Sequence, residues 1–429
     1  MKRKKIRSGW QKVVIQAALR WLCPALAMAA LLVLIAELRV WPDESGVRGE
    51  KARIKVENAN PEITATGRKE SNLGSLAMPM RRAKGHSEPC LKLPSDEVIE
   101  KLEFPSRLPS PLGDLRFAKQ SGSGVEANTN RFVGSQTMAE RNSSFQIREN
   151  MEVHCGFYGE DPGFDIDEVD TAFLKTCKAV VTTCNFGGGD DIYQPIGMSD
   201  ASLAKVCYVA FWDEVTLSQM PEDKRPSPDT RMAGLWRVVV VRNLPFNDQR
   251  RNGKIPKLLG HRLFPNVRYS IWVDSKYQFR RDPMAVFHAL LWSPQAALGI
   301  SEHGARRCVY REGKAVVAKN KALPAEVDLQ LSQYQAEGFP ENATFNGHKA
   351  LAEASVIVRE HTPVTNLFMC LWFNEVVRYT ARDQLSFPYV LRRFGLLQLN
   401  MFPVCTRKAL VNSIGHRQKA KPLERIPTE

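Results

Sequence analysis

Short apolar runs alternate with helix-like segments in the second half of the chain. Continuous apolar runs of this length are typical of buried parallel strands. Five runs have this character: Lys178–Cys184, Lys205–Trp212, Leu235–Val241, Tyr269–Asp274 and Ala297–His303. Helical spacing of apolar residues follows the third run, in residues 248–265, and the fourth, in residues 282–292. The alternation predicts an α/β fold with a doubly wound sheet, whose ligand sites lie at the carboxyl ends of strands.

A longer apolar run lies near the N-terminus. Residues 13–36 are apolar apart from a few polar positions and Arg20, and as a helix they would extend roughly 36 Å, enough for one bilayer span. The run is longer than the apolar region of an ordinary signal peptide, so we expect an uncleaved signal anchor rather than a cleaved signal. The basic residues within 1–12 predict a cytoplasmic tail and a lumenal body.

The segment after the expected anchor has a different composition. Residues 37–150 are rich in charged residues, Ser, Pro and Gly and show no sustained apolar periodicity. Such composition predicts a lumenal stem that is largely disordered and holds a folded domain away from the membrane.

Composition narrows the class of partner. The 429 residues carry a net charge of +14, which favours anionic partners. No zinc-finger, RNA-recognition or helix-turn-helix signature is present, so we expect no nucleic-acid partner.

An oxidising lumen would permit disulfides and N-glycosylation. Outside the expected span the cysteines are Cys90, Cys155, Cys177, Cys184, Cys207, Cys308, Cys370 and Cys405. Their pairing cannot be read from spacing, and buried free thiols are the alternative for those in apolar segments, such as Cys207 and Cys370. The sequons at Asn142 and Asn342 are candidate glycosylation sites.

Polar residues follow three of the predicted strands. The first is followed by NFGGGDDIYQPIG, in which Gly187, Gly188 and Gly189 could let backbone N–H groups approach phosphate, although an ordinary flexible turn is the alternative. Asp190 could contact a ribose or base. The second strand ends at Asp213 and the fourth, YSIWVD, at Asp274. Because carboxyl ends of parallel strands share one edge, these groups are expected to converge.

Basic residues lie between these strand ends, and carboxylates come later. Lys254 and Lys257, with neighbouring arginines, could neutralise a diphosphate, or could form a solvated basic face. Farther along, Glu353 and Asp383 are candidate carboxylates for catalysis, and an N-cap is the alternative for Asp383. His416 is a candidate metal ligand near the C-terminus.

Several blocks of sequence resemble a known family. They include CGFYGEDPGF, TTCNFGGGDDIYQPIGMS, VCYVAFWDEVT, YSIWVDSKYQFRRDP and FMCLWFNEVVRYTARDQLSFPYV. They are similar to a plant glycosyltransferase-like family, first catalogued as a domain of unknown function. Its members include a mucilage-related probable hexosyltransferase and a turgor-regulation protein reported as an alkaline ceramidase. The resemblance covers residues 151–425 and implies a catalytic domain with a GT-A-like mixed sheet and a Golgi type II membrane topology.

The resemblance also implies a donor site. GT-A folds carry an Asp-x-Asp motif whose carboxylates bind Mn²⁺ or Mg²⁺ on a nucleotide-sugar diphosphate. Here the matching residues are Asp274, Ser275 and Lys276, so the second carboxylate is missing. We expect metal-assisted transfer with Asp274 and His416 as ligands. The alternative is direct neutralisation of the diphosphate by Lys276 with Arg280 and Arg281.

The expected activity is hexosyl transfer from a nucleotide-sugar donor to a cell-wall polysaccharide or another glycan, with other Golgi glycosyltransferases as possible complex partners. Glu353 or Asp383 would then position or deprotonate the acceptor hydroxyl. One alternative is hydrolysis of the ceramide amide bond at a metal held by His303, His361 and His416. Another is a noncatalytic Golgi scaffold.

Overall fold

The computed structural model describes residues 90–107, 110–120, 130–148, 151–345 and 348–416. The expected tail, the expected anchor and residues 37–89 of the expected stem lie outside this part of the chain. Within it, no helix has both the length and the apolar character needed to cross a bilayer.

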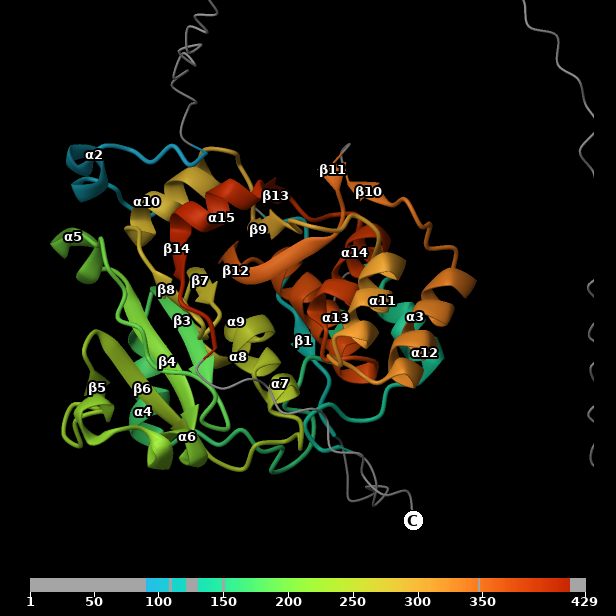
Figure 1. Ribbon diagram of the computed structural model, residues 1–429, viewed down its shortest axis with the longest axis horizontal. Helices are drawn as coiled ribbons and strands as arrows, with labels where there is room; N and C mark the ends of the chain where they lie inside the picture. The colour runs from blue at the N-terminus through green and yellow to red at the C-terminus, as the bar shows by residue number, and fades with distance from the viewer. Residues whose placement is uncertain (1–89, 108–109, 121–129, 149–150, 346–347, 417–429) are drawn as a thin grey trace, which may run out of the picture. The chain divides into compact units, whose positions relative to one another are not determined.

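An eight-stranded mixed sheet forms the centre of the fold (Figure 1). Its strands follow the spatial order β13-β9-β12-β7-β3-β4-β6-β5. Their bounds are β3 (Ala179–Asn185), β4 (Cys207–Asp213), β5 (Met232–Ala233), β6 (Trp236–Val241), β7 (Tyr269–Val273), β9 (Leu298–Glu302), β12 (Ala352–Glu360) and β13 (Leu399–Phe402). All five apolar runs of the sequence are strands, which confirms the α/β class.

The strand directions show the mixed sheet that the family resemblance implied and that the apolar runs alone did not. β3 is parallel to both β4 and β7, and β4 is parallel to β6. β12 is antiparallel to both β7 and β9, so β9 runs in the same direction as β7 without being its neighbour. The sequence does not show this because strand direction depends on the path of the connections, which apolar content does not record.

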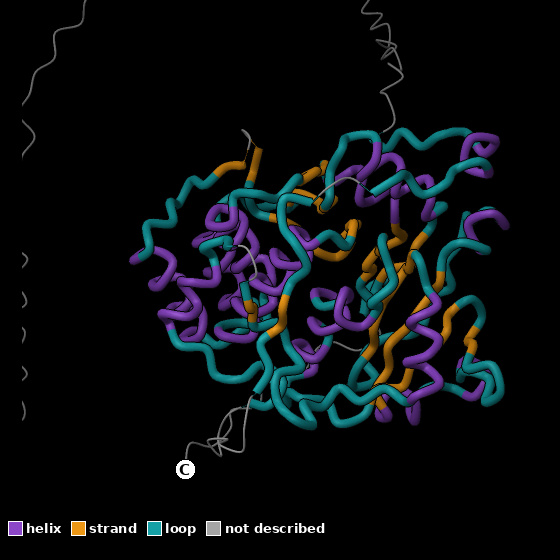
Figure 2. Tube along the Cα trace, turned by 180° about the vertical axis from the view of Figure 1, so that it is seen from behind, coloured by secondary structure: helices purple, strands orange, loops and turns teal. Residues whose placement is uncertain are grey.

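Side chains of the central strands alternate between two cores. Val180, Val209 and Val239 belong to one apolar cluster, whereas Val181 and Ala210 belong to the other. Because successive side chains point to opposite faces, buried side chains lie on both faces of the sheet. The strands therefore appear in the sequence as continuous apolar runs. Seen from behind, a large group of helices lies at one side of the strands, and further helices lie at the other side (Figure 2).

Helices cover both faces of the sheet. α4, α8, α11, α13 and α14 contribute to the first cluster, and α10 and η2 to the second. The helices are α2 (Asp96–Glu100), α3 (Met138–Ser144), α4 (Glu168–Thr176), α5 (Asp200–Leu203), α6 (Glu214–Gln219), η1 (Glu222–Lys224), α7 (Gln249–Asn252), α8 (Lys254–Leu258), α9 (Gly260–Leu263), α10 (Pro283–Phe287), η2 (His288–Trp292), α11 (Val309–Ala318), α12 (Pro324–Ala336), α13 (Pro363–Arg378), α14 (Asp383–Phe394) and α15 (Val404–Leu410).

Helix ends follow local signals in the sequence. Thr362 caps α13 by accepting a hydrogen bond from the Thr365 amide, and Pro363 follows at the first helical position. α14 ends at Gly395, whose positive φ of 70° suits glycine. Three two-stranded pairs lie outside the main sheet: β1 (Arg116–Phe117) with β2 (Glu152–Val153), β10 (Thr344–Phe345) with β11 (His348–Lys349), and β8 (Tyr277–Phe279) with β14 (Val411–Ser413).

The folded domain begins before residue 151, so the predicted boundary of the stem is wrong. Phe132 is fully buried in the first core cluster. Arg141, on α3, is only 1% exposed and forms an ion pair with Glu375 on α13. The sequence hid this region because two of the buried residues on α3, Arg141 and Ser144, are polar, and a search for apolar periodicity does not detect buried polar side chains.

Three disulfides connect distant parts of the domain. They are Cys90–Cys405, Cys155–Cys370 and Cys177–Cys207, whereas Cys184 and Cys308 are free. The free-thiol alternative for Cys207 and Cys370 is therefore wrong. Cys90 lies in the predicted stem, and its bond to Cys405 ties that segment to the C-terminal part of the domain.

Candidate functional site

The strand ends that the sequence singled out meet at one edge of the sheet. A pocket opens there between the ends of β3, β4 and β7 and the segment after β3. We call it the edge pocket; its lining residues are Thr183, Cys184, Asn185, Asp191, Ile192, Tyr193, Trp212, Trp236, Val273, Ser275 and Tyr277. Aromatic and polar side chains together are typical of small-molecule sites. The residues expected to converge here, Gly187, Asp213 and Asp274, do not line the pocket themselves. The sequence analysis did not single out Tyr193, Trp236 or Tyr277, which do.

The glycine loop next to this pocket is a turn held by hydrogen bonds from its own backbone amides. The Gly187 amide donates to Asp213 Oδ2 at 2.9 Å, and the Gly188 amide donates to Thr216 Oγ1 at 3.0 Å. Both glycines have positive φ, and a Cβ on Gly188 would lie 1.9 Å from the Gln219 side chain. The Gly187 amide is therefore used by Asp213 and the Gly188 amide by Thr216, rather than by a phosphate. Asp213 also caps α6 through the Thr216 amide.

Asp190 connects the glycine loop to two other segments. Its carboxylate accepts a hydrogen bond from Ser275 Oγ at 2.5 Å, and His416 Nδ1 lies 3.0 Å from its Oδ2. Asp190 is 5% exposed. The structure thus joins the loop after β3, the turn after β7 and the C-terminal segment at one carboxylate. His416, expected beside Asp274, instead contacts Asp190.

Asp274 lies within a group of fixed positive charges. Trp272 Nε1 donates to Asp274 Oδ1 at 2.8 Å, and Lys257 Nζ donates to the same oxygen at 3.1 Å. Lys276 Nζ lies 3.9 Å from Oδ2. Burial alone would raise the pKa of Asp274, but the charges of the neighbouring lysines outweigh it and hold that pKa below its ordinary value.

Asp383 completes this group. Its Oδ2 lies 2.7 Å from Lys254 Nζ and 2.8 Å from Lys257 Nζ, and the residue is 2% exposed. Burial is the largest single influence on the pKa values of Lys254, Lys257 and Asp383. The two aspartates nevertheless raise the pKa of Lys257 and the two lysines lower that of Asp383, while for Lys254 burial prevails and its pKa falls. Lys254 and Lys257 are therefore placed by α8 against Asp274 and Asp383, not on a solvated face.

The structure places Asp383 differently from both sequence interpretations. A carboxylate held ionised between two lysines is not available to take a proton from an acceptor, so Asp383 orients Lys254 and Lys257. Asp383 is the first residue of α14, whose N-cap position is Arg382. The N-cap interpretation is therefore wrong as well.

Glu353, the candidate acceptor-side carboxylate, lies at the same end of the sheet as Asp274. It lies near the start of β12, which runs antiparallel to β7 and pairs Val356 with Val273. Glu353 is opposite Ser301 of β9 and partly exposed, and its side chain has no hydrogen-bond partner among the described residues. A carboxylate in this position is free to contact a ligand.

His303 follows β9 at the same edge and was not assigned to the transfer site from sequence. Its Nδ1 accepts hydrogen bonds from the amides of Ala305 and Arg306, at 3.2 and 2.9 Å. Because Nδ1 is an acceptor, the ring proton of neutral His303 is on Nε2, which lies 3.6 Å from Glu312 Oε2.

The arginines beyond β8 have separate places. Arg280, expected to bind donor, donates from Nε to the Ala409 carbonyl at 3.2 Å and from Nη2 to the Lys408 carbonyl at 3.4 Å. It thereby holds the last turn of α15. That helix carries Arg407, whose Nη1 donates to the Tyr277 hydroxyl at 3.1 Å. Sequence reasoning missed Arg407 because nothing in its local pattern signals a site, and only the packing of α15 brings it to Tyr277.

The donor set at Asp274 does not fit Mn²⁺ or Mg²⁺. Both cations need several oxygen ligands, but one oxygen of Asp274 already bonds Trp272 and Lys257, and Lys276 occupies the position of the missing carboxylate. Asp190 and His416 contact each other, and within the described part of the chain they do not belong to a group of three metal-ligand side chains. Asp274 and His416 are therefore not brought together as the predicted metal ligands.

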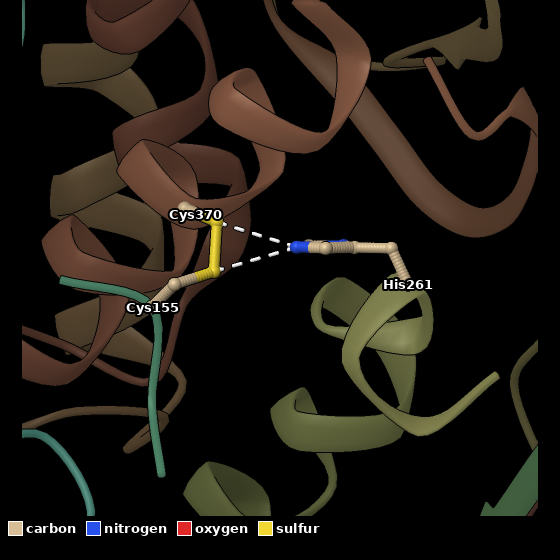
Figure 3. A group of neighbouring side chains, drawn as sticks. All are labelled: Cys155, His261 and Cys370. Carbon is tan, nitrogen blue, oxygen red and sulfur yellow. Dashed lines mark hydrogen bonds between the residues drawn. A yellow bond between two sulfur atoms is a disulfide. The ribbon is translucent and has the colours of Figure 1, made fainter. Parts of the chain in front are cut away.

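The one trio of metal-ligand type among the described residues lies elsewhere. Cys155, His261 and Cys370 converge, with His261 Nε2 at 3.4 and 3.3 Å from the two sulfurs (Figure 3). The sulfurs are joined as a disulfide, so they are not thiolate ligands. Burial is the main cause that lowers the pKa of His261 well below its ordinary value, so the ring is neutral.

The histidines proposed for ceramide hydrolysis do not form a metal site. His303 follows β9 at the pocket edge, whereas His361 follows β12, whose last residue Glu360 pairs with Tyr269 at the start of β7. Because β9 and β12 are antiparallel, His303 and His361 lie at opposite ends of the strands. His361 is buried against Ser270, with Nε2 2.8 Å from Ser270 Oγ.

A family model matches residues 115–416 of the chain and describes a TOD1/MUCI70 glycosyltransferase-like domain. The chain belongs to this family. The match begins well before residue 151, in agreement with the earlier start of the folded domain. Membership supports a glycosyltransferase-like domain, and the resemblance of the sequence blocks is confirmed.

Two relatives from Arabidopsis thaliana are similar over most of this chain. "Probable hexosyltransferase MUCI70" is 41% identical over 305 residues, which are 68% of this chain and 52% of that protein. "Alkaline ceramidase TOD1" is 30% identical over 323 residues, 72% of this chain and 67% of that protein. The aligned part of the chain thus spans about half the length of the first relative.

Two solved structures of glycosyltransferases overlap with part of the fold. Mouse xyloside xylosyltransferase 1, in its apo form, gives a TM-score of 0.31 at 8% identity and covers 52% of this chain and 84% of its own. The bifunctional glycosyltransferase WbbM gives a TM-score of 0.29 at 11% identity and covers 52% of this chain and 38% of its own.

Proposed function

We propose that the protein is a glycosyltransferase that takes a hexose from a nucleotide-sugar donor bound at the edge pocket. The observation that carries the proposal is the meeting of three strand ends at an aromatic pocket beside the lysine and aspartate group. Ligands of open α/β sheets bind at this edge. Membership in the TOD1/MUCI70 family supports the same chemistry.

The pocket residues suit the parts of a donor. The rings of Tyr193, Trp236 and Tyr277 line the edge pocket, and aromatic faces of this kind stack on nucleobases. The free volume of the pocket is about 10 Å³, the size of one water molecule, so a donor would enter only after these side chains move apart. Ser275, whose hydroxyl donates to Asp190, keeps an oxygen that would accept a hydrogen bond from the ribose, and the adjacent Lys276 would contact the diphosphate. In the transfer, the bond between the anomeric carbon and the diphosphate oxygen breaks, and a bond to the acceptor oxygen forms.

Glu353 is the proposed acceptor-side residue. In an inverting transfer its carboxylate would accept the proton of the attacking hydroxyl while the nucleoside diphosphate leaves. Its position on β12, near the end of β7 and without a hydrogen-bond partner in the described chain, supports this role. Asp383, which is ion-paired with two lysines, does not suit it.

The location and partners are part of the same proposal. The apolar residues 13–36 would anchor a type II protein in the Golgi membrane with its domain in the lumen, where a cell-wall polysaccharide or another glycan is the acceptor. Other Golgi glycosyltransferases are candidate partners. Asn342 is exposed in a turn and Asn142 is exposed on α3, which suits N-glycosylation of either.

Ceramide hydrolysis is the second candidate because of the TOD1 relative. The separation of His303 from His361 argues against the histidine-held metal on which that mechanism rests.

The test is a panel of nucleotide sugars and a ceramide substrate supplied to the full chain. We expect release of a nucleoside diphosphate from one donor and no fatty acid from ceramide. Glu353→Gln should lower turnover at least about tenfold with little change in donor affinity, since general-base catalysis contributes about 10²-fold or more. Glu160→Gln, at an exposed loop position, is the matched control. Fatty-acid release without donor turnover would refute the transferase.

A further inference from the structure

Two cations flank Tyr277 at the rim of the edge pocket. Lys276 Nζ lies 5.3 Å from the centre of the Tyr277 ring, and the Arg407 guanidinium carbon lies 6.0 Å from the same point. The two come from segments far apart in the sequence: the turn after β7 and the helix α15. Tyr277 lines the pocket, and both charges lie beside its ring.

The Arg407 guanidinium group has a hydrogen-bond donor left over for an anion. Nη1 donates to the Tyr277 hydroxyl and lies 3.5 Å from Ser355 Oγ, whereas its buried Nε has no hydrogen-bond partner. Within the described residues no carboxylate forms an ion pair with it. A half-buried guanidinium without a counter-charge is costly unless an anion binds it.

Lys276 is also weakly compensated. Its one ion pair in the described chain is with Asp274 Oδ2 at 3.9 Å, and its side chain is 27% exposed. Asp274 is already shared with Lys257, whose Nζ is closer, at 3.1 Å. Asp274 therefore interacts more strongly with Lys257 than with Lys276, and the Lys276 ammonium group remains available to a ligand.

We propose that Lys276 and Arg407 bind the donor's diphosphate directly, without a bridging divalent cation. The inference rests on the proposed function and specifies how the same site holds its donor. The two side chains replace the charge that a divalent ion would supply, and they stay in place after the sugar leaves. Arg280 acts as a positioning residue because it holds the last turn of the helix that carries Arg407.

The test is calorimetric titration of the full chain with a panel of nucleoside diphosphates and with inorganic pyrophosphate, in EDTA and again in Mn²⁺. We expect the affinity in EDTA to be within about twofold of that in Mn²⁺. Lys276→Ala and Arg407→Gln should each weaken diphosphate binding about tenfold or more, because charge-assisted hydrogen bonds to phosphate are lost. Lys276→Arg should restore most of the affinity.

Lys175→Ala is the matched control because Lys175 is an exposed lysine on α4, before β3. It should bind as the unmodified chain does. Binding that disappears in EDTA and returns with Mn²⁺ would overturn the inference while leaving the transferase in place. Equal binding by Lys276→Ala and the unmodified chain would also overturn it. Failure of every nucleoside diphosphate to bind in either condition would refute the proposed function and the inference with it.

Discussion

Arg141 donates two hydrogen bonds to the carboxylate of Glu375, at 2.6 and 3.0 Å, across 234 positions of sequence. Both side chains are almost fully buried. The pair connects α3, in the region that its composition assigned to a stem, to α13 in the centre of the domain. The segment before residue 151 is thus part of the folded unit.

Arg141→Met should lower the free energy of unfolding by about 3–5 kcal/mol, because it leaves Glu375 buried without its counter-charge. Chemical denaturation measures this. Arg242→Met, which removes an ion pair between two exposed side chains, should cost less than about 1 kcal/mol. Adding Glu375→Leu to Arg141→Met should recover part of the loss. A loss no larger than that of Arg242→Met would show that the stem segment is not needed for folding.

Asp274→Asn should reduce donor turnover by about tenfold or more. The substitution keeps the shape of the side chain but removes the charge that holds Lys257 and Lys276, and hydrogen bonds to charged groups contribute about 1.5–3 kcal/mol. Release of nucleoside diphosphate measures it, and Asp223→Asn, at an exposed position, is the control. Turnover within about threefold of the unmodified enzyme, less than about 1 kcal/mol, would contradict a role for Asp274.

A bound donor should protect Cys184 from alkylation but not Cys308. Both thiols are free, but Cys184 lines the edge pocket and Cys308 does not. Burial is the main cause that raises the pKa of Cys184, so its labelling should also be the slower of the two without ligand. Mass spectrometry of the labelled peptides measures both rates. Equal protection of the two thiols would place the donor elsewhere.

Stability should decrease as the pH falls below about 6.5, the ordinary pKa of histidine. Burial is the main cause that lowers the pKa values of His261 and His361 well below their ordinary value in the folded state. The unfolded chain then binds protons that the folded chain does not, and the folded state loses up to about 1.4 kcal/mol per pH unit for each group. Above pH 7 these two histidines are neutral in both the folded and the unfolded chain, so the loss is absent there.

Thermal unfolding between pH 7.5 and about 5 measures this dependence. His361→Gln should flatten the profile because it removes one of the two buried imidazoles. His288→Gln, at a histidine on η2, is the control. An unchanged slope in His361→Gln would show that His361 titrates normally.

The local pattern of the sequence was sufficient for the α/β class and for the strand that ends before Asp274. Apolar runs record burial, and burial on both faces of a sheet is a local property of each strand. The meeting of Asp190, Asp213 and Asp274 at one edge also followed, because neighbouring parallel strands end at the same side. The pattern was insufficient for strand direction, so antiparallel β12 and its carboxylate Glu353 were placed only by the fold.

Tertiary structure alone decided what each charged residue does. Asp383 and Lys257 are 126 positions apart in the chain numbering, yet their side chains are 2.8 Å apart, and this contact changes Asp383 from a candidate base into a permanent counter-charge. Arg407 reaches Tyr277 only because α15 packs beside β8 and the Cys90–Cys405 bond holds its first turn. Amino-acid type determines the charge that a residue can carry, but its pKa, its partner and its access to a ligand depend on neighbours that the chain brings together from far away.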